Sequence, residues 1–275
     1  MGQPDERAPN RRAVTVSVVI PVKDDAQELR ECLRALARQT RLADEIVVVD
    51  NGSSDASALV AAELGARLVP HPRGGIPAAS AAGYDAARGD IIARMDADCL
   101  PDARWLEHIV EAFDERADVS AISGGARFAE SPGWPGRVLA GLYLGGYYAV
   151  LTPTLGHVPL FGSNFAMRRS AWQAVSAEVH RDDLLVHDDL DLAFHLGRAH
   201  RIAFDRRLGM TISMRPLTEP SSYGLRVRRG FHTVFVHWPQ DFPPRRWWRS
   251  YRRARAAVEP ERSETLPTAR ASAQR

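Results

Sequence analysis

Acidic side chains follow two short apolar runs in the N-terminal part of the chain. Asp96 and Asp98 stand one residue apart after a run that ends at Met95, and Asp50 follows the run 45–49. Two carboxylates at this spacing can point to one location if the chain bends between them, and a divalent cation relieves their repulsion. Hard oxygen ligands suit Mg²⁺ or Mn²⁺, which bridge to substrate phosphates. The pair therefore predicts a metal-bound diphosphate; the alternative is a solvated turn.

The elements that position these residues alternate between two periodicities. Short β-branched runs predict strands, and apolar residues at helical spacing between them predict helices. This alternation implies an α/β fold with a Rossmann-like, mostly parallel sheet flanked by helices. The predicted strands are 14–20, 45–49, 66–69, 90–95 and 119–123, and the predicted helices are 25–36, 55–64, 77–88, 102–115, 188–198 and 223–236.

Ligands of such sheets bind beyond the carboxyl ends of the strands. Pro21, Val22 and Asp24 follow the first strand, so we assign them, together with Asp50 and Asp96, to the side of the sheet that binds the diphosphate-containing ligand. The Asp50 carboxylate can accept a hydrogen bond from a base N–H or a ribose hydroxyl. The alternative is that the residues after it form only a turn with a helix cap.

Composition limits the function classes. With 275 residues, 45% of them hydrophobic and 25% charged, the chain can bury a full core. The net charge of +2, from 36 basic and 34 acidic side chains, lacks the basic surface typical of nucleic-acid binders. Cys32 and Cys99 are the only cysteines, and no spacing suggests structural zinc or a disulfide framework. These features predict a cytoplasmic protein without a nucleic-acid partner.

Three segments lie outside the predicted alternation of strands and helices, and two of them bear on contact with a membrane. Residues 1–13 predict a disordered tail. The apolar stretch 138–151 is shorter than the ~20 residues that a span needs, so no transmembrane helix is expected. The tract 245–253 mixes arginines with three aromatic residues. It indicates either a membrane-surface segment or an edge helix with its tryptophans packed inward.

Three motifs in order carry a family resemblance: SVVIPVKDD at 17–25, VVVDNGSSD at 47–55 and ARMDADC at 93–99. Together they resemble family 2 glycosyltransferases with the GT-A fold. The resemblance spans roughly residues 14–204. We expect a GT-A domain at 14–240, with a nucleotide-sugar-binding half at 14–124 and a smaller acceptor-side lobe at 125–240. The composition of 241–275 predicts an Arg-rich, partly disordered tail.

The resemblance also implies a catalytic acidic pair. The segment VHDDLDLAFHL, at 186–196, matches the family's later acidic motif, with Asp188 where glutamate is commoner. By register Asp189 is the catalytic base, accompanied by Asp188. Acids at a helix N-terminus also complement the helix dipole, and both interpretations can hold.

Further positions take roles only through the resemblance. Arg73 stands where the family contacts the donor, and Gly162, Ser163 and Asn164 stand where it shapes the acceptor site, although a plain β-turn explains these three equally well. His232 lies where some GT-A enzymes supply a third metal ligand. The alternative is a packed or exposed histidine that binds no metal.

The implied reaction is the transfer of a sugar from a nucleoside-diphosphate sugar, with inversion at the anomeric carbon and with Mn²⁺ or Mg²⁺. A UDP-sugar is the expected donor. The acceptor is a hydroxyl of a saccharide, small molecule or lipid. One rival is a catalytically silent nucleotide-sugar-binding or scaffold protein. Another is a lipid-acceptor enzyme peripheral to the inner face of the membrane. The chain has no counterpart of the processive synthases' Gln-x-x-Arg-Trp signature.

Overall fold

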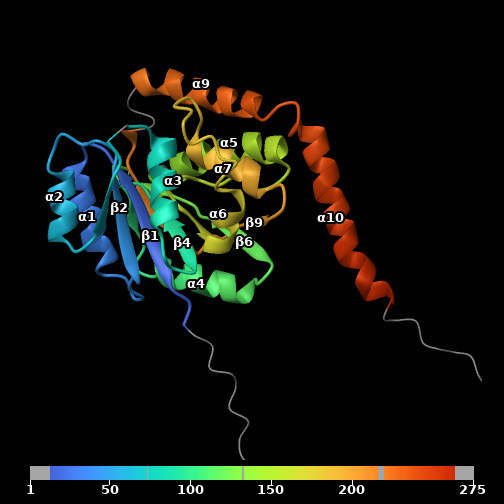
Figure 1. The fold of residues 1–275 in the computed structure, drawn as a ribbon, viewed down its shortest axis with the longest axis horizontal. Helices are drawn as coiled ribbons and strands as arrows, with labels where there is room; N and C mark the ends of the chain where they lie inside the picture. The colour runs from blue at the N-terminus through green and yellow to red at the C-terminus, as the bar shows by residue number, and fades with distance from the viewer. Residues whose placement is uncertain (1–12, 73, 132, 216–219, 264–275) are drawn as a thin grey trace, which may run out of the picture.

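The computed structural model describes residues 13–72, 74–131, 133–215 and 220–263. A seven-stranded sheet lies at its centre, in the order β3-β2-β1-β4-β8-β6-β9 (Figure 1). The first four strands along the chain pair in parallel, as the alternation of strands and helices predicts. They are β1 (Val16–Val22), β2 (Glu45–Asp50), β3 (Arg67–Pro70) and β4 (Ile91–Arg94).

The sheet departs from pure parallel pairing at one strand that the sequence did not reveal. β8 (Phe165–Arg168) lies between β4 and β6 (Val119–Ser123) and is antiparallel to both. β9 (Arg201–Phe204) then pairs in parallel with β6. The insertion matters for function because it brings the segment just before β8 beside the end of β4.

Alternate residues of β1 face opposite layers, as the two-residue period of a strand requires. Val16, Val18 and Ile20 pack in one core cluster with α1 (Ala26–Leu36) and α4 (Trp105–Glu115). Val19 packs in the other cluster, with three helices on the opposite face. Those helices are α3 (Ile76–Ala86), α6 (Arg169–Val175) and α7 (Asp188–Leu196). The sheet therefore sits between two helical layers.

Side-chain hydrogen bonds explain where one helix begins. α2 (Ser57–Glu63) starts two residues after the predicted Asp55. Asp55 accepts hydrogen bonds from the backbone N–H groups of Ser57, at 2.9 Å, and of Ala26, at 2.9 Å. One carboxylate thus accepts the first N–H of two neighbouring helices, from outside their N-cap positions Asp25 and Ala56, and links α1 to α2.

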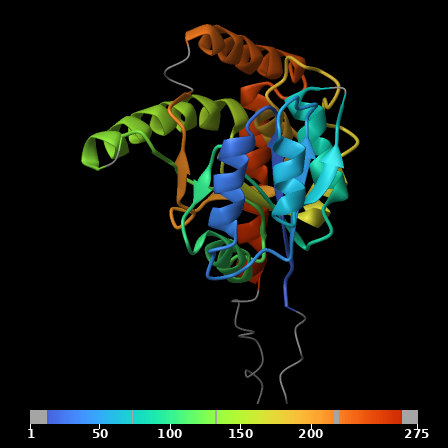
Figure 2. The same ribbon diagram turned by 90° about the vertical axis from the view of Figure 1, so that its left-hand side faces the viewer.

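A small second sheet and a long helix lie outside the central sheet. The small sheet has the order β5-β10-β7 and consists of β5 (Leu100–Pro101), β10 (Met210–Ile212) and β7 (Arg127–Phe128). α5 (Trp134–Leu155) extends further than the apolar stretch suggested, and one of its ends projects beyond the sheet (Figure 2). Among the described helices, only the segment 138–155 of α5 is long and apolar enough to cross a membrane, and 17% of this segment is buried inside the structure.

The end of the described chain is more ordered than its composition suggested. α9 (Pro220–Val236) is followed by α10 (Pro243–Ser263), so much of the predicted tail is helical. Buried Arg246 anchors α10 by donating to the carbonyls of Leu155 and Phe194. Of the two alternatives for residues 245–253, the structure contradicts the one with both tryptophans packed inward, because Trp247 and Trp248 are 50% and 61% exposed.

Candidate active site

The last residue of β4 joins two acidic motifs. The buried guanidinium of Arg94 places Nη2 3.0 Å from Oδ1 of Asp96 and 3.4 Å from Oδ2 of Asp188. Burial disfavours the charge on Arg94, but the two carboxylates outweigh that effect and raise its pKa. Sequence reasoning missed Arg94, although a cation that ends an apolar, fully buried strand is itself a signal of a paired charge.

The carboxylate pair predicted as a metal site lies at the same strand end. Ser163 Oγ donates to Oδ2 of Asp96 at 2.6 Å, and Arg215 Nη2 lies 3.2 Å from Oδ2 of Asp98. Burial, followed by repulsion from Asp96, raises the pKa of Asp98 to about 6, although Arg215 opposes this shift. The Asp98 side chain is 24% exposed, so both partial burial and the nearby Asp96 disfavour its negative charge.

These residues fit a hard divalent cation. The candidate ligand atoms of Asp96, Asp98 and Cys99 all lie within 4.8 Å of one another. Burial raises the pKa of the Cys99 thiol well above its usual value, so this group stays protonated. Two carboxylates remain, which suits Mn²⁺ or Mg²⁺ with further oxygen ligands from water and phosphate.

The predicted base lies at the N-terminus of α7. Oδ2 of Asp189 accepts the backbone N–H of Gly162 at 2.8 Å, and Oδ1 accepts that of Leu190 at 2.7 Å. Burial raises the pKa of Asp189, and His187 and Arg94 only partly oppose this. Its neighbour Asp188 has a carboxylate oxygen within 4.8 Å of one of Asp189 and accepts from Ser80 Oγ of α3 at 2.7 Å, a contact that no sequence motif indicated.

The segment predicted to shape the acceptor site divides into two roles. Gly162 and Ser163 contact the acidic groups described above, and a Cβ on Gly162 would lie 2.5 Å from Nη1 of Arg94 and 2.9 Å from Oδ2 of Asp189. Asn164 is different, because it is fully buried. Its Oδ1 accepts from Trp105 Nε1, and its Nδ2 donates to two carbonyls. The structure therefore gives Asn164 a structural role instead of an acceptor contact.

The predicted donor residues gather at the ends of β1 and β2. Pro21 and Val22 pair in register with Val49 and Asp50, so both strands end at one edge. Oδ1 of Asp50 accepts the N–H of Ser53 at 2.9 Å. The Asp24 carboxylate accepts from the N–H of Ser54 at 2.7 Å, and this bond lowers its pKa. Both carboxylates thus brace the turn that follows β2, and Arg73 lies outside the described residues.

His232 is not in the carboxylate group. It lies on α9, and its Nε2 is 2.7 Å from Oδ2 of Asp183. The structure therefore pairs His232 with a different acid and does not bring it to the metal motif. The residue that does reach Asp98 is Arg215, which also lies 2.8 Å from Asp25.

Comparisons with known proteins identify the family of the chain. The model of the family described as glycosyl transferase family 2 matches residues 17–175. The glycosyltransferase AglE of Haloferax volcanii is 33% identical over 121 residues, which cover 41% of this chain and 40% of that protein. An undecaprenyl-phosphate 4-deoxy-4-formamido-L-arabinose transferase of Pseudomonas fluorescens is 33% identical over 135 residues, with 45% and 40% covered.

Solved structures show the same fold. A mannosyltransferase of Pyrobaculum calidifontis, in complex with GDP-Man and Mn²⁺, has a TM-score of 0.59 at 19% identity and covers 93% of this chain and 79% of that one. Glucosyl-3-phosphoglycerate synthase of Mycobacterium tuberculosis, in complex with Mn²⁺, UDP-glucose and phosphoglyceric acid, has a TM-score of 0.56 at 24% identity, with 81% and 79% covered.

The chain spans about half the length, or less, of the curated relatives it matches. The match to the family model covers more than half of the chain itself and includes the strand ends with Asp50, Asp96 and Asp98, while Asp188 and Asp189 lie beyond it. Sheet order, carboxylate geometry and family match thus lead to one conclusion: the chain belongs to glycosyl transferase family 2 and has the GT-A fold.

Proposed function

We propose that the protein transfers a sugar from a nucleoside-diphosphate sugar to an acceptor hydroxyl, with inversion at the anomeric carbon and Asp189 as general base. The observation that carries this proposal is the position of Arg94. Its guanidinium contacts both Asp96 of the metal motif and Asp188 beside the base. A leaving diphosphate and an attacking hydroxyl can therefore meet at one place.

The chemistry assigned to Asp189 follows from its surroundings. It takes the proton of the acceptor hydroxyl while the acceptor oxygen bonds to the anomeric carbon and the bond from that carbon to the diphosphate breaks. A raised pKa makes the carboxylate a better proton acceptor. The hydrogen bond from Gly162 holds its orientation. Bound Mn²⁺ or Mg²⁺, held by Asp96 and Asp98, supplies charge neutralisation for the departing diphosphate.

The donor is proposed as a UDP-sugar, and UDP-glucose is bound in one structural neighbour and GDP-Man in another. Isothermal titration calorimetry of UDP, GDP and dTDP with and without Mn²⁺ tests this. We expect Mn²⁺-dependent binding of UDP, and Asp98→Ala should weaken it by about tenfold or more because the metal loses a ligand. Asp182→Ala, at an exposed acid, is the matched control. Unchanged affinity in Asp98→Ala would contradict the metal role.

Hydrolysis of the donor separates an enzyme from a silent binding protein. With Mn²⁺ and no acceptor, the wild-type chain should release nucleoside diphosphate slowly from its UDP-sugar. Binding without any release, and without transfer to any acceptor, would favour the binding protein.

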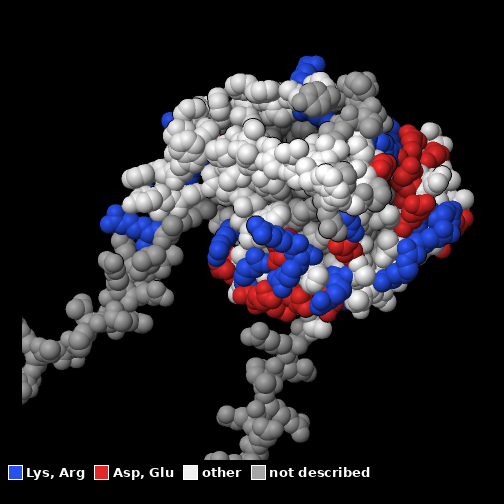
Figure 3. All heavy atoms as spheres, turned by 180° about the vertical axis from the view of Figure 1, so that it is seen from behind, with Lys and Arg blue, Asp and Glu red and all other residues white. Residues whose placement is uncertain are grey.

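A second candidate makes the acceptor a polyprenyl phosphate at the membrane surface. Exposed apolar side chains recur every four residues on two helices: Trp134, Val138 and Leu142 on α5, and Val227, Phe231 and Phe235 on α9. Exposed Trp247, Trp248 and Tyr251 lie on α10. Figure 3 shows a broad uncharged surface above the charged side chains. Apolar stripes of this kind suit insertion into the headgroup region.

Relatives named for transfer to undecaprenyl phosphate support this candidate. It places the protein on the inner face of a membrane, as a peripheral protein. Flotation with anionic vesicles tests it: the wild type should float, and Leu142→Glu combined with Phe231→Glu should remain at the bottom. Leu59→Glu, at an exposed leucine of α2, is the control. A wild type that fails to float would contradict the candidate.

A further inference from the structure

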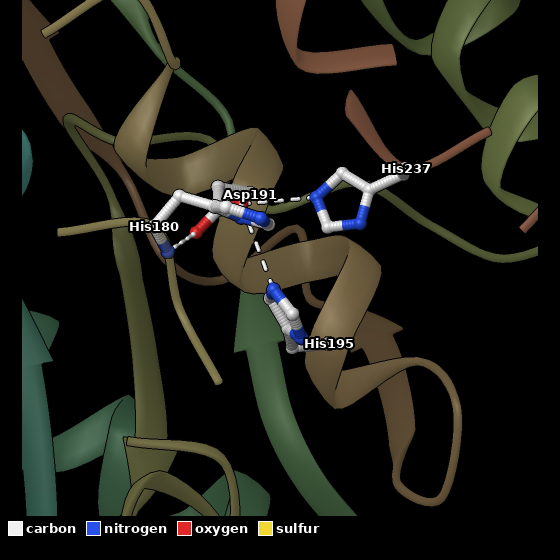
Figure 4. A group of neighbouring side chains, drawn as sticks. All are labelled: His180, Asp191, His195 and His237. Carbon is white, nitrogen blue, oxygen red and sulfur yellow. Dashed lines mark hydrogen bonds and ion pairs between the residues drawn. The ribbon is translucent and has the colours of Figure 1, made fainter. Parts of the chain in front are cut away.

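Three histidines converge on one aspartate in the C-terminal half of the molecule (Figure 4). Oδ1 of Asp191 lies 2.7 Å from His180 Nδ1, 2.9 Å from His237 Nε2 and 3.6 Å from His195 Nε2. The four residues come from the loop after α6, from α7 and from the chain just after α9. One ligand atom of each lies within 4.8 Å of all the others.

The centre of this cluster is secluded and contains an unsatisfied atom. Asp191, His195 and His237 are buried, while His180 is partly exposed and offers a route of entry. Nε2 of His195 is buried without a hydrogen-bond partner and points into the cluster. Buried polar atoms are nearly always satisfied, so an orphan aimed at three other ligand atoms indicates a missing partner.

The outer nitrogens of two rings face carboxylates. His195 Nδ1 lies 3.4 Å from Oε2 of Glu178, and His237 Nδ1 lies 3.9 Å from Oδ2 of Asp241. Arg198 links these carboxylates, because its Nη1 lies 2.7 Å from Oε2 of Glu178 and its Nη2 lies 2.6 Å from Oδ2 of Asp241. Arg198 Nη1 also lies 3.2 Å from His195 Nδ1. Metal-ligating histidines commonly donate their second ring N–H to a carboxylate, which directs the other nitrogen at the metal.

We propose that His180 Nδ1, His195 Nε2, His237 Nε2 and a carboxylate oxygen of Asp191 bind a zinc ion, at a site separate from the Asp96–Asp98 centre. Three imidazoles and one carboxylate form a ligand set typical of Zn²⁺, in contrast to the hard oxygens of the other site. Tetrahedral bonds of about 2.0 to 2.1 Å separate ligand atoms by roughly 3.3 to 3.4 Å. The separation of 3.6 Å is close to this value, and those of 2.7 and 2.9 Å need to open by about half an ångström.

The site offers four protein ligands and leaves no open position, which is the coordination number of a structural zinc site, here with histidine and aspartate in place of the usual cysteines. A bound ion would tie the loop at His180 and the end of α9 to α7, the helix whose first turn carries Asp188 and Asp189. Zinc would therefore stabilise the acceptor side of the molecule without contacting the reacting groups.

The test uses the full chain, stripped with a chelator, incubated with Zn²⁺ and desalted. Elemental analysis should find about one zinc per chain in the wild type and in Asp98→Ala, in which the other centre is impaired. Zinc should fall to background in His195→Ala and His237→Ala, and persist in the matched control His108→Ala, at a histidine of α4. Stable binding by His195→Ala at the wild-type level would overturn the proposal.

Two measurements on the wild type alone keep the test decisive if the variants do not fold. Free Zn²⁺ at one hundred times its Kd should raise the Tm by roughly 5 to 11 °C, and a chelator should reverse the shift. Co²⁺ in place of zinc should give the intense visible absorption of a four-coordinate ion. If Zn²⁺ neither shifts the Tm nor remains after desalting, the cluster is a hydrogen-bond network around the Asp191 anion and the proposal is wrong.

Discussion

Asp189 and Asp191 are two residues apart on one helix, yet their carboxyl groups have opposite pKa shifts. Burial and the neighbouring Asp188 raise the pKa of Asp189. Burial acts in the same direction on Asp191, but its contacts with His195, His237 and His180 outweigh that effect and hold the pKa far below the usual range. Because two helical positions differ by about 200°, the two groups face different surroundings. Burial acts in the same direction on both acids, so the groups around each carboxylate decide the difference between their pKa values.

The comparison separates two functions along α7. Asp189 receives two backbone hydrogen bonds and retains affinity for a proton, as a base requires. Asp191 remains an anion surrounded by nitrogen atoms, as a metal ligand or a structural anchor requires. Substitutions at the two positions should therefore affect different measurements.

Asp189→Asn should have the largest effect, on catalysis alone. Removal of a positioned general base typically lowers turnover by about 10²- to 10⁴-fold. Asparagine keeps the size of the side chain and can still accept from Gly162, so donor binding and unfolding should change little. Steady-state transfer kinetics and calorimetry of UDP with Mn²⁺ measure the two quantities. Wild-type turnover in the variant would remove Asp189 from its role, and exposed Asp182→Asn controls for the substitution.

Asp191→Asn should show the reverse pattern. A carboxylate that accepts several buried hydrogen bonds contributes about 2 to 4 kcal/mol, so the variant should unfold that much more easily in chelator-treated protein near neutral pH. Since the pKa of Asp191 is lowered, its contribution is present above the unfolded value of 3.8 and is lost as pH falls below it. Urea unfolding at two pH values measures this. Equal stability of the variant and the wild type at neutral pH would contradict the interpretation.

The acidic residues at the strand ends could be predicted because the pattern that identifies them lies within a few residues of each one in the sequence. Asp50, Asp96 and Asp98 each follow an apolar run, and parallel strands carry such residues to one edge of the sheet. Arg94 was missed because one of its two partners, Asp188, is 94 residues away and reaches it only through the tertiary fold. Asn164 was misassigned because turn residues look alike in sequence, whether they face solvent or bind Trp105 inside the core.

The histidine cluster could not be predicted for a related reason. Asp191 and His195 show a four-residue spacing on a predicted helix, but His180 and His237 come from segments on either side of α7. Only the packing of the loop after α6 and of α9 against that helix brings them together. An edge helix was one of two alternatives for residues 245–253, but the length of α10 was not predicted because its contacts, such as those of buried Arg246 with Leu155 and Phe194, depend on the tertiary fold.

Asp98→Asn should have the smallest effect, and it extends the comparison to a third acid. Like Asp189, Asp98 has a raised pKa, so the folded state holds its proton more tightly than the unfolded chain does. The charged form therefore destabilises the fold above about pH 6, and this cost disappears as pH falls toward 3.8. In chelator-treated protein near neutral pH, the variant should be more stable than the wild type by about 1 to 2 kcal/mol, after allowance for the lost ion pair with Arg215.

Urea unfolding at about pH 7.5 and about pH 4.5 measures this difference in stability. The difference should shrink at the lower pH because the wild-type acid is then neutral as well. A difference that stays constant with pH would mean that packing, and not charge, separates the two proteins.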